Sequence, residues 1–180
     1  FISDLGNISP QDVDGNPTEI LTDSANIAID VTPVNDAPLW TVPGLQNVNE
    51  DSDLIIGGIL VDDRDITRRP DIILEAKLSA AHGTITLNNT TGITFIEGGD
   101  GQASMIFQGT VPGLNAALEN LIYHGDLDYH DADRINLFIS DLGNVSPVDG
   151  LGNPTEILID ETFIDIQVVP VNDAPTLTTP

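Results

Sequence analysis

The residues with the clearest chemistry in this sequence are an Asn-Asp pair held between two prolines, and the pair occurs twice. It stands at Asn35-Asp36 within the phrase Pro33–Pro38, and again at Asn172-Asp173 within Pro170–Pro175. Proline fixes φ and lacks a backbone N–H, so each phrase is expected to be extended, stiff and outside any central strand. Amide and carboxylate oxygens are ligands of hard cations. Both phrases are therefore expected to be connectors between domains that a bound cation can rigidify.

Further acidic side chains gather in short stretches between the two connectors. The stretches are Asn49-Glu50-Asp51, Asp62-Asp63-Arg64-Asp65, Asp126–Asp131 and the turn that begins at Asp141. The whole chain holds 29 acidic and 5 basic residues, a formal net charge of −24. Self-repulsion of this size destabilises a compact state unless something offsets it. Bound divalent cations are one such offset, and the alternative is that these acids are solvated residues of turns and caps.

The same charge argues against two classes of partner. Nucleic acid and anionic membrane surfaces carry phosphates, which require Lys and Arg for binding. No stretch is apolar and long enough to span a bilayer, so no membrane insertion is expected. The sequence contains no cysteine, which excludes disulfides and thiolate metal sites. Ser, His and Asp are present without a nucleophile elbow or similar context, so we do not expect an enzyme.

The duplication extends beyond the connectors. Phe1–Pro43 aligns with Phe138–Pro180 without a gap, and about two thirds of the aligned positions are identical, which indicates a tandem repeat. The sequence is expected to be part of a longer array. Its expected divisions are the C-terminal hairpin of a preceding repeat (1–33), a linker (34–38), one complete repeat (39–171), and a linker with the start of the next repeat (172–180).

Within these divisions the apolar pattern predicts short strands and one helix. Alternating residues predict a strand at Asn26–Thr32 and again at Thr162–Val169, where it pairs with Ile135–Ser140. Leu54–Val61 is expected to be a strand with a bulge or bend at its two glycines, and Gly92–Ile96 is expected to pair with Ala103–Gln108. Leucines and alanines at helical spacing predict a helix at Pro112–Asn120. The expected fold is an all-β sandwich of about seven strands with one short helix.

Taken in order, these motifs resemble the cadherin-like tandem repeats of large bacterial adhesins and surface proteins, especially their chondroitin-sulfate-proteoglycan-type relatives. The resemblance covers essentially the whole chain, and its most specific element is the duplicated Val-Asn-Asp-Ala-Pro linker. It implies a cadherin-like or immunoglobulin-like β-sandwich repeat located outside the cell or at its surface. The other motifs that carry it are Glu50, Asp63-Arg64-Asp65, Leu127–His130, Asp141-Leu142-Gly143, Ala81–Leu87 and Gly113–Leu118.

In that family Ca²⁺ binds between successive domains, and the resemblance implies two groups of ligands here. One group would comprise Asn35, Asp36, Asp63, Asp65 and Asp141. The other would comprise Glu50, Asp128, Asn172 and Asp173. Two departures from the family pattern imply fewer or weaker sites: Pro33 and Pro170 stand where family linkers usually have another Asp, and His130 stands where an acid is usual.

The expected function is that of a calcium-rigidified structural repeat in an extracellular array, such as an adhesin or matrix protein. The alternatives are a module that recognises a glycan or a protein, and an accessory domain of a secreted enzyme. A glycan binder usually presents exposed aromatic side chains, whereas Trp40 is the one Trp here and follows the linker closely, which favours the structural repeat. The expected partners are neighbouring repeats of the same chain, with other copies in a fibre or cell-surface layer as a further option.

Overall fold

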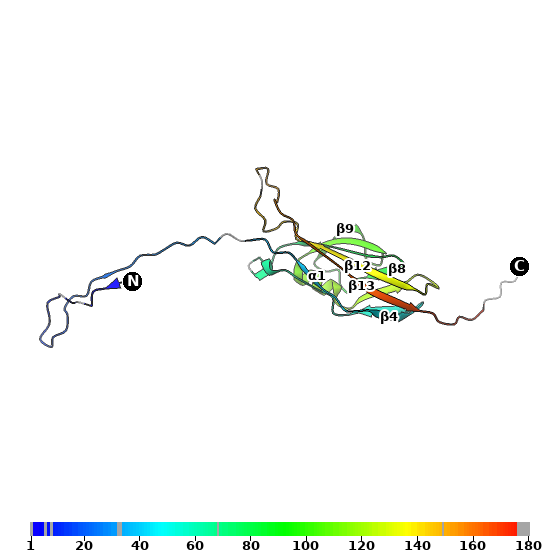
Figure 1. The fold of residues 1–180 in the computed structure, drawn as a ribbon, viewed down its shortest axis with the longest axis horizontal. Helices are drawn as coiled ribbons and strands as arrows, with labels where there is room; N and C mark the ends of the chain where they lie inside the picture. Colours follow the sequence, from blue (N-terminus) through cyan, green and yellow to red (C-terminus); the bar gives the residue numbers. More distant parts are fainter. Residues whose placement is uncertain are drawn as a thin grey trace. The chain divides into compact units, whose positions relative to one another are not determined.

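The structure is a computed structural model that describes residues 2–5, 7, 9–31, 34–67, 69–148 and 150–175. The chain divides into two compact units, Phe1–Pro33 and Val34–Pro180, whose ribbons are drawn in Figure 1. The assignment of these units to successive repeats stays a prediction. Residues 176–180, the expected start of a further repeat, lie outside the described residues.

The first unit is a hairpin with a long loop. Strand β1 (Ile2–Ser3) pairs antiparallel with β2 (Thr22–Asp23). The loop is closed by side chains that bond to its own backbone: the Asp4 carboxylate accepts from Leu21 N at 3.1 Å, and Thr18 Oγ1 donates to the Pro10 carbonyl at 2.7 Å. Asp and Thr side chains often replace backbone partners in this way.

The strand expected at Asn26–Thr32 is not formed over the described part of that range, residues 26–31. Thr32 lies outside the described residues. The prediction was wrong because the alternating pattern encodes a strand that still needs a neighbouring strand, and a short strand without a ladder and an apolar surface to cover is not stable in water.

The second unit is a β-sandwich. Its larger sheet has the strand order β4 (Gln46–Asn49), β13 (Ile159–Val169), β12 (Ala132–Ser140), β7 (Leu74–Ala80), β10 (Ser104–Gly109) and β9 (Ile93–Gly98). The opposing strands are β5 (Asp53–Ile56), β11 (Leu121–Gly125) and β8 (Gly83–Thr86) in one sheet, and β3 (Leu39–Thr41) with β6 (Leu60–Asp62) in another. All pairs are antiparallel except β4 with β13. The all-β sandwich expected from the sequence is therefore confirmed.

Alternation along the strands builds the core. In β12 the side chains of Ile135, Leu137 and Ile139 are buried, while the residues between them face outward. The partner strand β13 buries Ile164, Ile166 and Val168 in the same way. Full burial of one such side chain contributes about 1.5–3 kcal/mol. The inward faces of these sheets and of the helix together form one apolar cluster.

The expected helix is present as α1 (Val111–Leu118). The Thr110 hydroxyl caps its start by accepting from Gly113 N at 3.3 Å, and Pro112 suits the first turn because its missing N–H would have no partner there. The buried side chains of Leu114 and Leu118 attach the helix to the core. Within the described residues, no helix has the length and apolar character needed to cross a membrane.

The interruption expected at Gly57-Gly58 is present, but the prediction of a single strand over Leu54–Val61 was wrong, because the segment forms two strands. Strands β5 and β6 belong to different sheets, with Gly57-Gly58 at the corner between them. Gly58 has φ +80°, which a glycine adopts without strain. After the corner, Asn115 of α1 bonds both backbone groups of Val61, at 2.7 and 3.0 Å. Such interruptions explain why the second unit has more and shorter strands than the seven expected.

Candidate metal centre

The first linker is attached to the sandwich through polar atoms. Residues 34–38 form neither helix nor strand, which leaves the side chain of Asn35 and the backbone of Asp36 free to bond elsewhere. Asn35 Nδ2 donates to Asp141 Oδ2 at 2.5 Å. The backbone N–H of Asp36 donates to Asp65 Oδ2 at 3.0 Å. Together with Asp63 these residues form what we call the near-end cluster: Asn35, Asp36, Asp63, Asp65 and Asp141.

Asp65 reaches the linker from a 3₁₀ turn, η1 (Arg64–Thr67), and Asp63 lies between the end of β6 and this turn. Asp63 Oδ1 caps this turn by accepting from Asp65 N at 2.8 Å. The other carboxylate oxygen, Asp63 Oδ2, is buried without a hydrogen-bond partner, and so is Asn35 Oδ1. Asp63 is 2% exposed and Asn35 7%. Native proteins rarely leave such oxygens unpartnered, because each costs about 1–3 kcal/mol.

Asp141 has a structural task as well as its contact with the linker. It follows the last residue of β12, and its Oδ1 accepts from Gly143 N at 2.8 Å and from Leu158 N at 2.9 Å. These bonds close the long loop 142–158 that projects between β12 and β13 in Figure 1. The side chain is 1% exposed. One buried carboxylate thus holds the loop with one oxygen and the linker with the other.

The electrostatics of the near-end cluster are unfavourable without a cation. Burial is the largest cause that raises the pKa of the Asp63 carboxyl above its usual value. The N–H of Asp65 lowers this pKa in part, whereas the negative charges of the other cluster carboxylates raise it. None of the ion pairs among the described residues involves a near-end carboxylate. The arrangement therefore provides oxygen ligands and a negative potential that no ion pair among the described residues neutralises.

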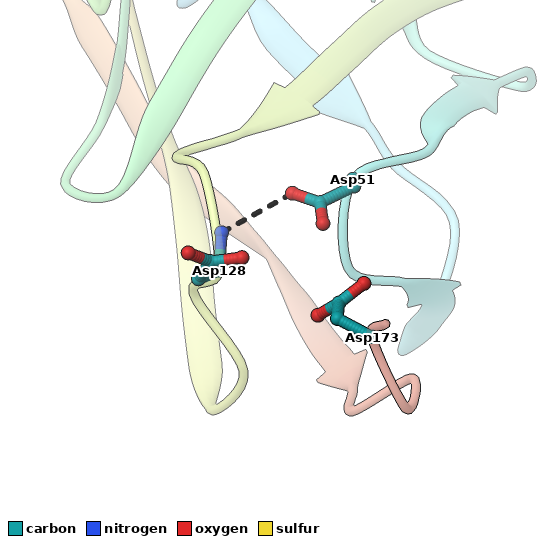
Figure 2. Close-up of side chains that lie close together, drawn as sticks. All are labelled: Asp51, Asp128 and Asp173. Atoms are coloured by element: carbon teal, nitrogen blue, oxygen red, sulfur yellow. Dashed lines mark hydrogen bonds between the residues drawn. The ribbon is translucent and has the colours of Figure 1, made fainter. Parts of the chain in front are cut away.

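A second group of acids lies at the opposite ends of β12 and β13. The carboxylates of Asp51, Asp128 and Asp173 each offer an oxygen, and these three atoms lie within 4.8 Å of one another. Figure 2 shows them converging from three separate loops, with Asp128 N donating to Asp51 Oδ1 at 3.1 Å. All three are exposed. With Glu50 they form what we call the far-end cluster.

Glu50 is the buried member of the far-end cluster and is already bonded. Its Oε1 accepts from Val171 N of the second linker at 2.6 Å, and its Oε2 lies 3.3 Å from His130 Nδ1. The carbonyl of Asp128 is the main cause that raises the pKa of His130, and Glu50 raises it further. His130 therefore supplies Glu50 with a protein partner that the near-end carboxylates lack.

The loop that carries Asp128 is fixed by its neighbour Tyr129. The Tyr129 ring stacks on His82 with 4.2 Å between ring centroids, and its hydroxyl donates to the Ala132 carbonyl at 2.7 Å. Asp128 and Asp51 both have positive φ, near +57°, which Asp tolerates better than most residues. The close approach of these two acids is thus built into two tight turns.

The near-end cluster consists of the five residues expected for one ligand group, and the far-end cluster contains three of the four expected for the other, Glu50, Asp128 and Asp173. Asn172 precedes Asp173 and is exposed, whereas its counterpart Asn35 is buried. Asp51 was missing from the expected ligands. Its position directly after Glu50 was the available signal, but sequence alone did not show that its turn faces Asp128. Whether any of these residues binds a metal stays a prediction.

The chain has only weak structural similarity to known proteins. No family model matches the sequence, and no curated protein matches it. Among solved structures, the chain is similar to EC1-2 of human mucin-like protocadherin, with 15% sequence identity and a TM-score of 0.35. This match covers 88% of this chain and 64% of that chain, so it spans less than two thirds of the protocadherin structure. It is also similar to a cohesin module from a family 33 glycoside hydrolase of Clostridium perfringens, with 12% identity and a TM-score of 0.34, over 77% of this chain and all of that chain. Similarity this weak carries no argument about function.

Proposed function

We propose that this chain is a calcium-rigidified structural module of an extracellular tandem array, as in an adhesin or a matrix protein. The observation that carries the proposal is the pair of buried, unpartnered oxygens in the near-end cluster, Asn35 Oδ1 from the linker and Asp63 Oδ2 from the sandwich. A buried carboxylate and a buried amide oxygen beside further carboxylates are what a hard cation requires and what a core without an ion avoids.

Bound calcium would supply positive charge to the near-end cluster. Asp63, Asp65 and Asp141 would hold it from the sandwich, and Asn35 and Asp36 from the linker. Calcium takes six to eight oxygen ligands, with water completing the set. Because linker and sandwich contribute to one ion, the linker would lose its freedom to swing, which is the mechanical function of a spacer.

The far-end cluster would serve the second linker in the same way. Asp51, Asp128 and Asp173 are exposed and close together, and Asp173 comes from the linker itself. In this proposal 1–33 is the last hairpin of one repeat, 39–171 is a complete repeat, and the partners are the repeats on either side. Other copies in a fibre or surface layer are further partners of the same kind.

One observation favours a second candidate function, a recognition module. The outer face of the larger sheet has an open groove of about 700 Å³, lined by residues that include Phe138, Phe163 and Lys77, the only lysine in the chain. Exposed aromatic side chains suit stacking against a sugar ring or a partner side chain. Binding of a glycan or protein ligand that is lost in Phe163→Ala, and is the same in calcium and in chelator, would favour recognition over the spacer.

Thermal unfolding in chelator and in millimolar calcium tests the spacer proposal. A ligand that binds only the folded state stabilises it by mass action, so wild type should melt at a higher temperature in calcium. Asp63→Asn should lose most of this shift. Asp71→Asn is the matched control, because it removes the same charge from an exposed position in the same loop. Equal melting temperatures of wild type in the two buffers would contradict the proposal.

A further inference from the structure

The groove on the outer face of the larger sheet adjoins a second one. The second groove has a volume of about 440 Å³, and Asn136 of β12 lines both. The same strand contributes Phe138 to the first groove and Ala132 to the second. Six residue steps along a strand span about 20 Å. The two grooves together, which we call the outer groove, are therefore long enough for a chain of more than one ring.

The strand register places apolar and polar side chains side by side in the outer groove. Ile106, Lys77, Phe138 and Glu161 lie opposite one another on the four neighbouring strands β10, β7, β12 and β13. All four line the groove. The Phe138 ring is thus flanked by the residue with an ammonium group on one strand and by the residue with a carboxylate on the next.

The next row of the ladder adds an amide and a second aromatic ring. Asn136 of β12 lies opposite Phe163 of β13, whose side chain is 47% exposed. Arg134 holds this ring in place, because its guanidinium lies 3.8 Å from the ring centre and pairs with Asp165 at 2.8 Å. A ring that is already fixed loses little conformational freedom when a ligand stacks on it. The outer groove therefore has a preorganised aromatic surface.

The lining of the outer groove differs between the two copies of the duplicated segment, whereas the core positions do not. Ser24 and Asn26 stand where β13 has Glu161 and Phe163. The three buried isoleucine and valine residues of β13 are repeated without change in the first copy. Since inward side chains decide whether a strand fits a core, the fold does not require Glu161 or Phe163. These two residues are available for a function specific to this copy.

The charges of the outer groove favour a neutral ligand. Glu75, Glu161 and Asp165 line it in a chain of net charge −24, and this negative potential opposes an anion. Lys77 makes no ion pair among the described residues, and its ammonium opposes a cation. Hydroxyl groups both donate and accept, so a sugar can bond ammonium, amide and carboxylate groups together. The apolar face of a sugar ring suits contact with Phe163.

We propose that the outer groove binds a neutral oligosaccharide. Phe138 and Phe163 contact the apolar faces of its rings, and Lys77, Asn136 and Glu161 bond its hydroxyls. The inference rests on the recognition function named above and gives that function its ligand class. The lining residues are separate from the near-end and far-end clusters, so saccharide binding and calcium binding are independent.

Titration of the full chain with neutral oligosaccharides tests this inference. The probes are linear oligomers of glucose, N-acetylglucosamine, galactose and mannose, added in chelator and followed by calorimetry and by NMR amide shifts. We expect saturable binding of at least one of them, with the shifts centred on β7, β12 and β13. Phe163→Ala should weaken this binding by about tenfold or more, because the stacking surface is lost. Asn136→Ala should weaken it several-fold.

Ile96→Ala is the matched control, because it removes an exposed apolar side chain from β9 of the same sheet and should leave binding unchanged. Phe163→Asn introduces the side chain that the first copy carries, so it should keep the fold and still lose binding; urea unfolding checks that each variant is folded. Saccharide binding without stabilisation by calcium would support this inference while contradicting the spacer.

Three results would overturn the inference. They are no binding of any of the four neutral oligomers, binding that survives in both Phe163 variants, and tighter binding of an oligomer of galacturonic acid than of its neutral galactose counterpart. The last result would show that the groove selects an anion.

Discussion

The loops in the two copies of the duplicated segment share hydrogen bonds, but the surroundings of the two copies differ. In the first, the Asp4 carboxylate accepts from Leu21 N; in the second, the Asp141 carboxylate accepts from Leu158 N. Further bonds within the loop repeat in the same pairs, including Thr18 and Thr155 to the carbonyls of Pro10 and Pro147. The loop conformation is thus encoded by the local sequence and needs no sandwich.

Burial separates the two copies. Ile29 and Ile166 align, yet one is solvent-exposed and the other is in the core. Asn35 and Asn172 align, yet only Asn35 is buried, because only the first linker meets Asp63, Asp65 and Asp141 within the described residues. Identical residues therefore contribute differently to stability and to the candidate site, depending on whether the sandwich covers them. In each aligned pair, a substitution at one position can be compared with the same substitution at the other position as its control.

The largest difference is expected for the core isoleucine. Ile166→Ala should destabilise the sandwich by about 2–5 kcal/mol, because a buried side chain is lost and a cavity remains. Ile29→Ala removes the same atoms from an exposed position and should change the free energy of unfolding by no more than about 0.5 kcal/mol. Urea unfolding followed by fluorescence of Trp40, which packs against the core, measures both. Similar losses for the two variants would mean that residues 22–31 are covered in solution.

The next difference is expected for the loop anchor. Asp141→Ala leaves the N–H groups of Gly143 and Leu158 without their acceptor and should cost about 2–4 kcal/mol in chelator as well as in calcium. Asp4→Ala should open its own loop but leave the unfolding of the sandwich unchanged, since Asp4 lies in the other unit. The same urea titration applies. If Asp141→Ala is destabilising only in calcium, its main role is that of a ligand and the loop bonds contribute little.

A smaller effect is expected for the two linker asparagines. For a site with Kd on the order of 10⁻⁴–10⁻³ M, calcium at about 1 mM should raise the free energy of unfolding by about 0.4–1.4 kcal/mol. Asn35→Ala should lose most of this gain, because it removes a buried oxygen of the near-end cluster. Asn172→Ala should retain it. Calcium titrations monitored by calorimetry and by melting compare the two, and equal losses would show that both linkers contribute to calcium sites in the isolated chain.

The smallest effect is a pH dependence confined to the near-end cluster. The pKa of Asp63 is higher in the folded chain than its ordinary value of 3.8. Its contribution to stability is therefore fully present below the unfolded pKa and is lost as the pH rises through the folded pKa. In chelator, Asp63→Asn should gain stability relative to Asp71→Asn as the pH is raised from about 3.8 towards neutrality. Parallel pH–stability curves for these two variants would contradict the raised pKa.

The raised pKa of Asp63 also predicts how calcium affinity changes with pH. The ion should bind the ionised Asp63 carboxylate, so its apparent affinity should fall as the pH is lowered through the folded pKa of Asp63. Asp63→Asn should be as stable as wild type or more so in chelator at neutral pH, and less stable than wild type in calcium. This reversal in the relative stability of Asp63→Asn and wild type distinguishes a calcium ligand from a residue that contributes only packing.

Sequence alone determined the features that depend on local pattern. Alternation gave the strands of the final hairpin, helical spacing gave α1, and the repeated Pro-Val-Asn-Asp-Ala-Pro phrase marked the connectors. The ligand groups came from the resemblance to cadherin-like repeats, which supplied the order of motifs. These features are readable because a strand, a helix turn or a proline-bound connector is specified by residues close together in the chain.

Only the tertiary structure decided which atoms meet. It turned the expected strand at Leu54–Val61 into two strands around Gly58, and it brought Asp51 beside Asp128 across a distance in sequence that no periodicity encodes. It also buried Asn35 and left Asn172 exposed, although the two share one sequence context. The physical reason is that burial and unpartnered oxygens arise from packing between distant segments, so identical residues acquire different environments when different surfaces lie against them.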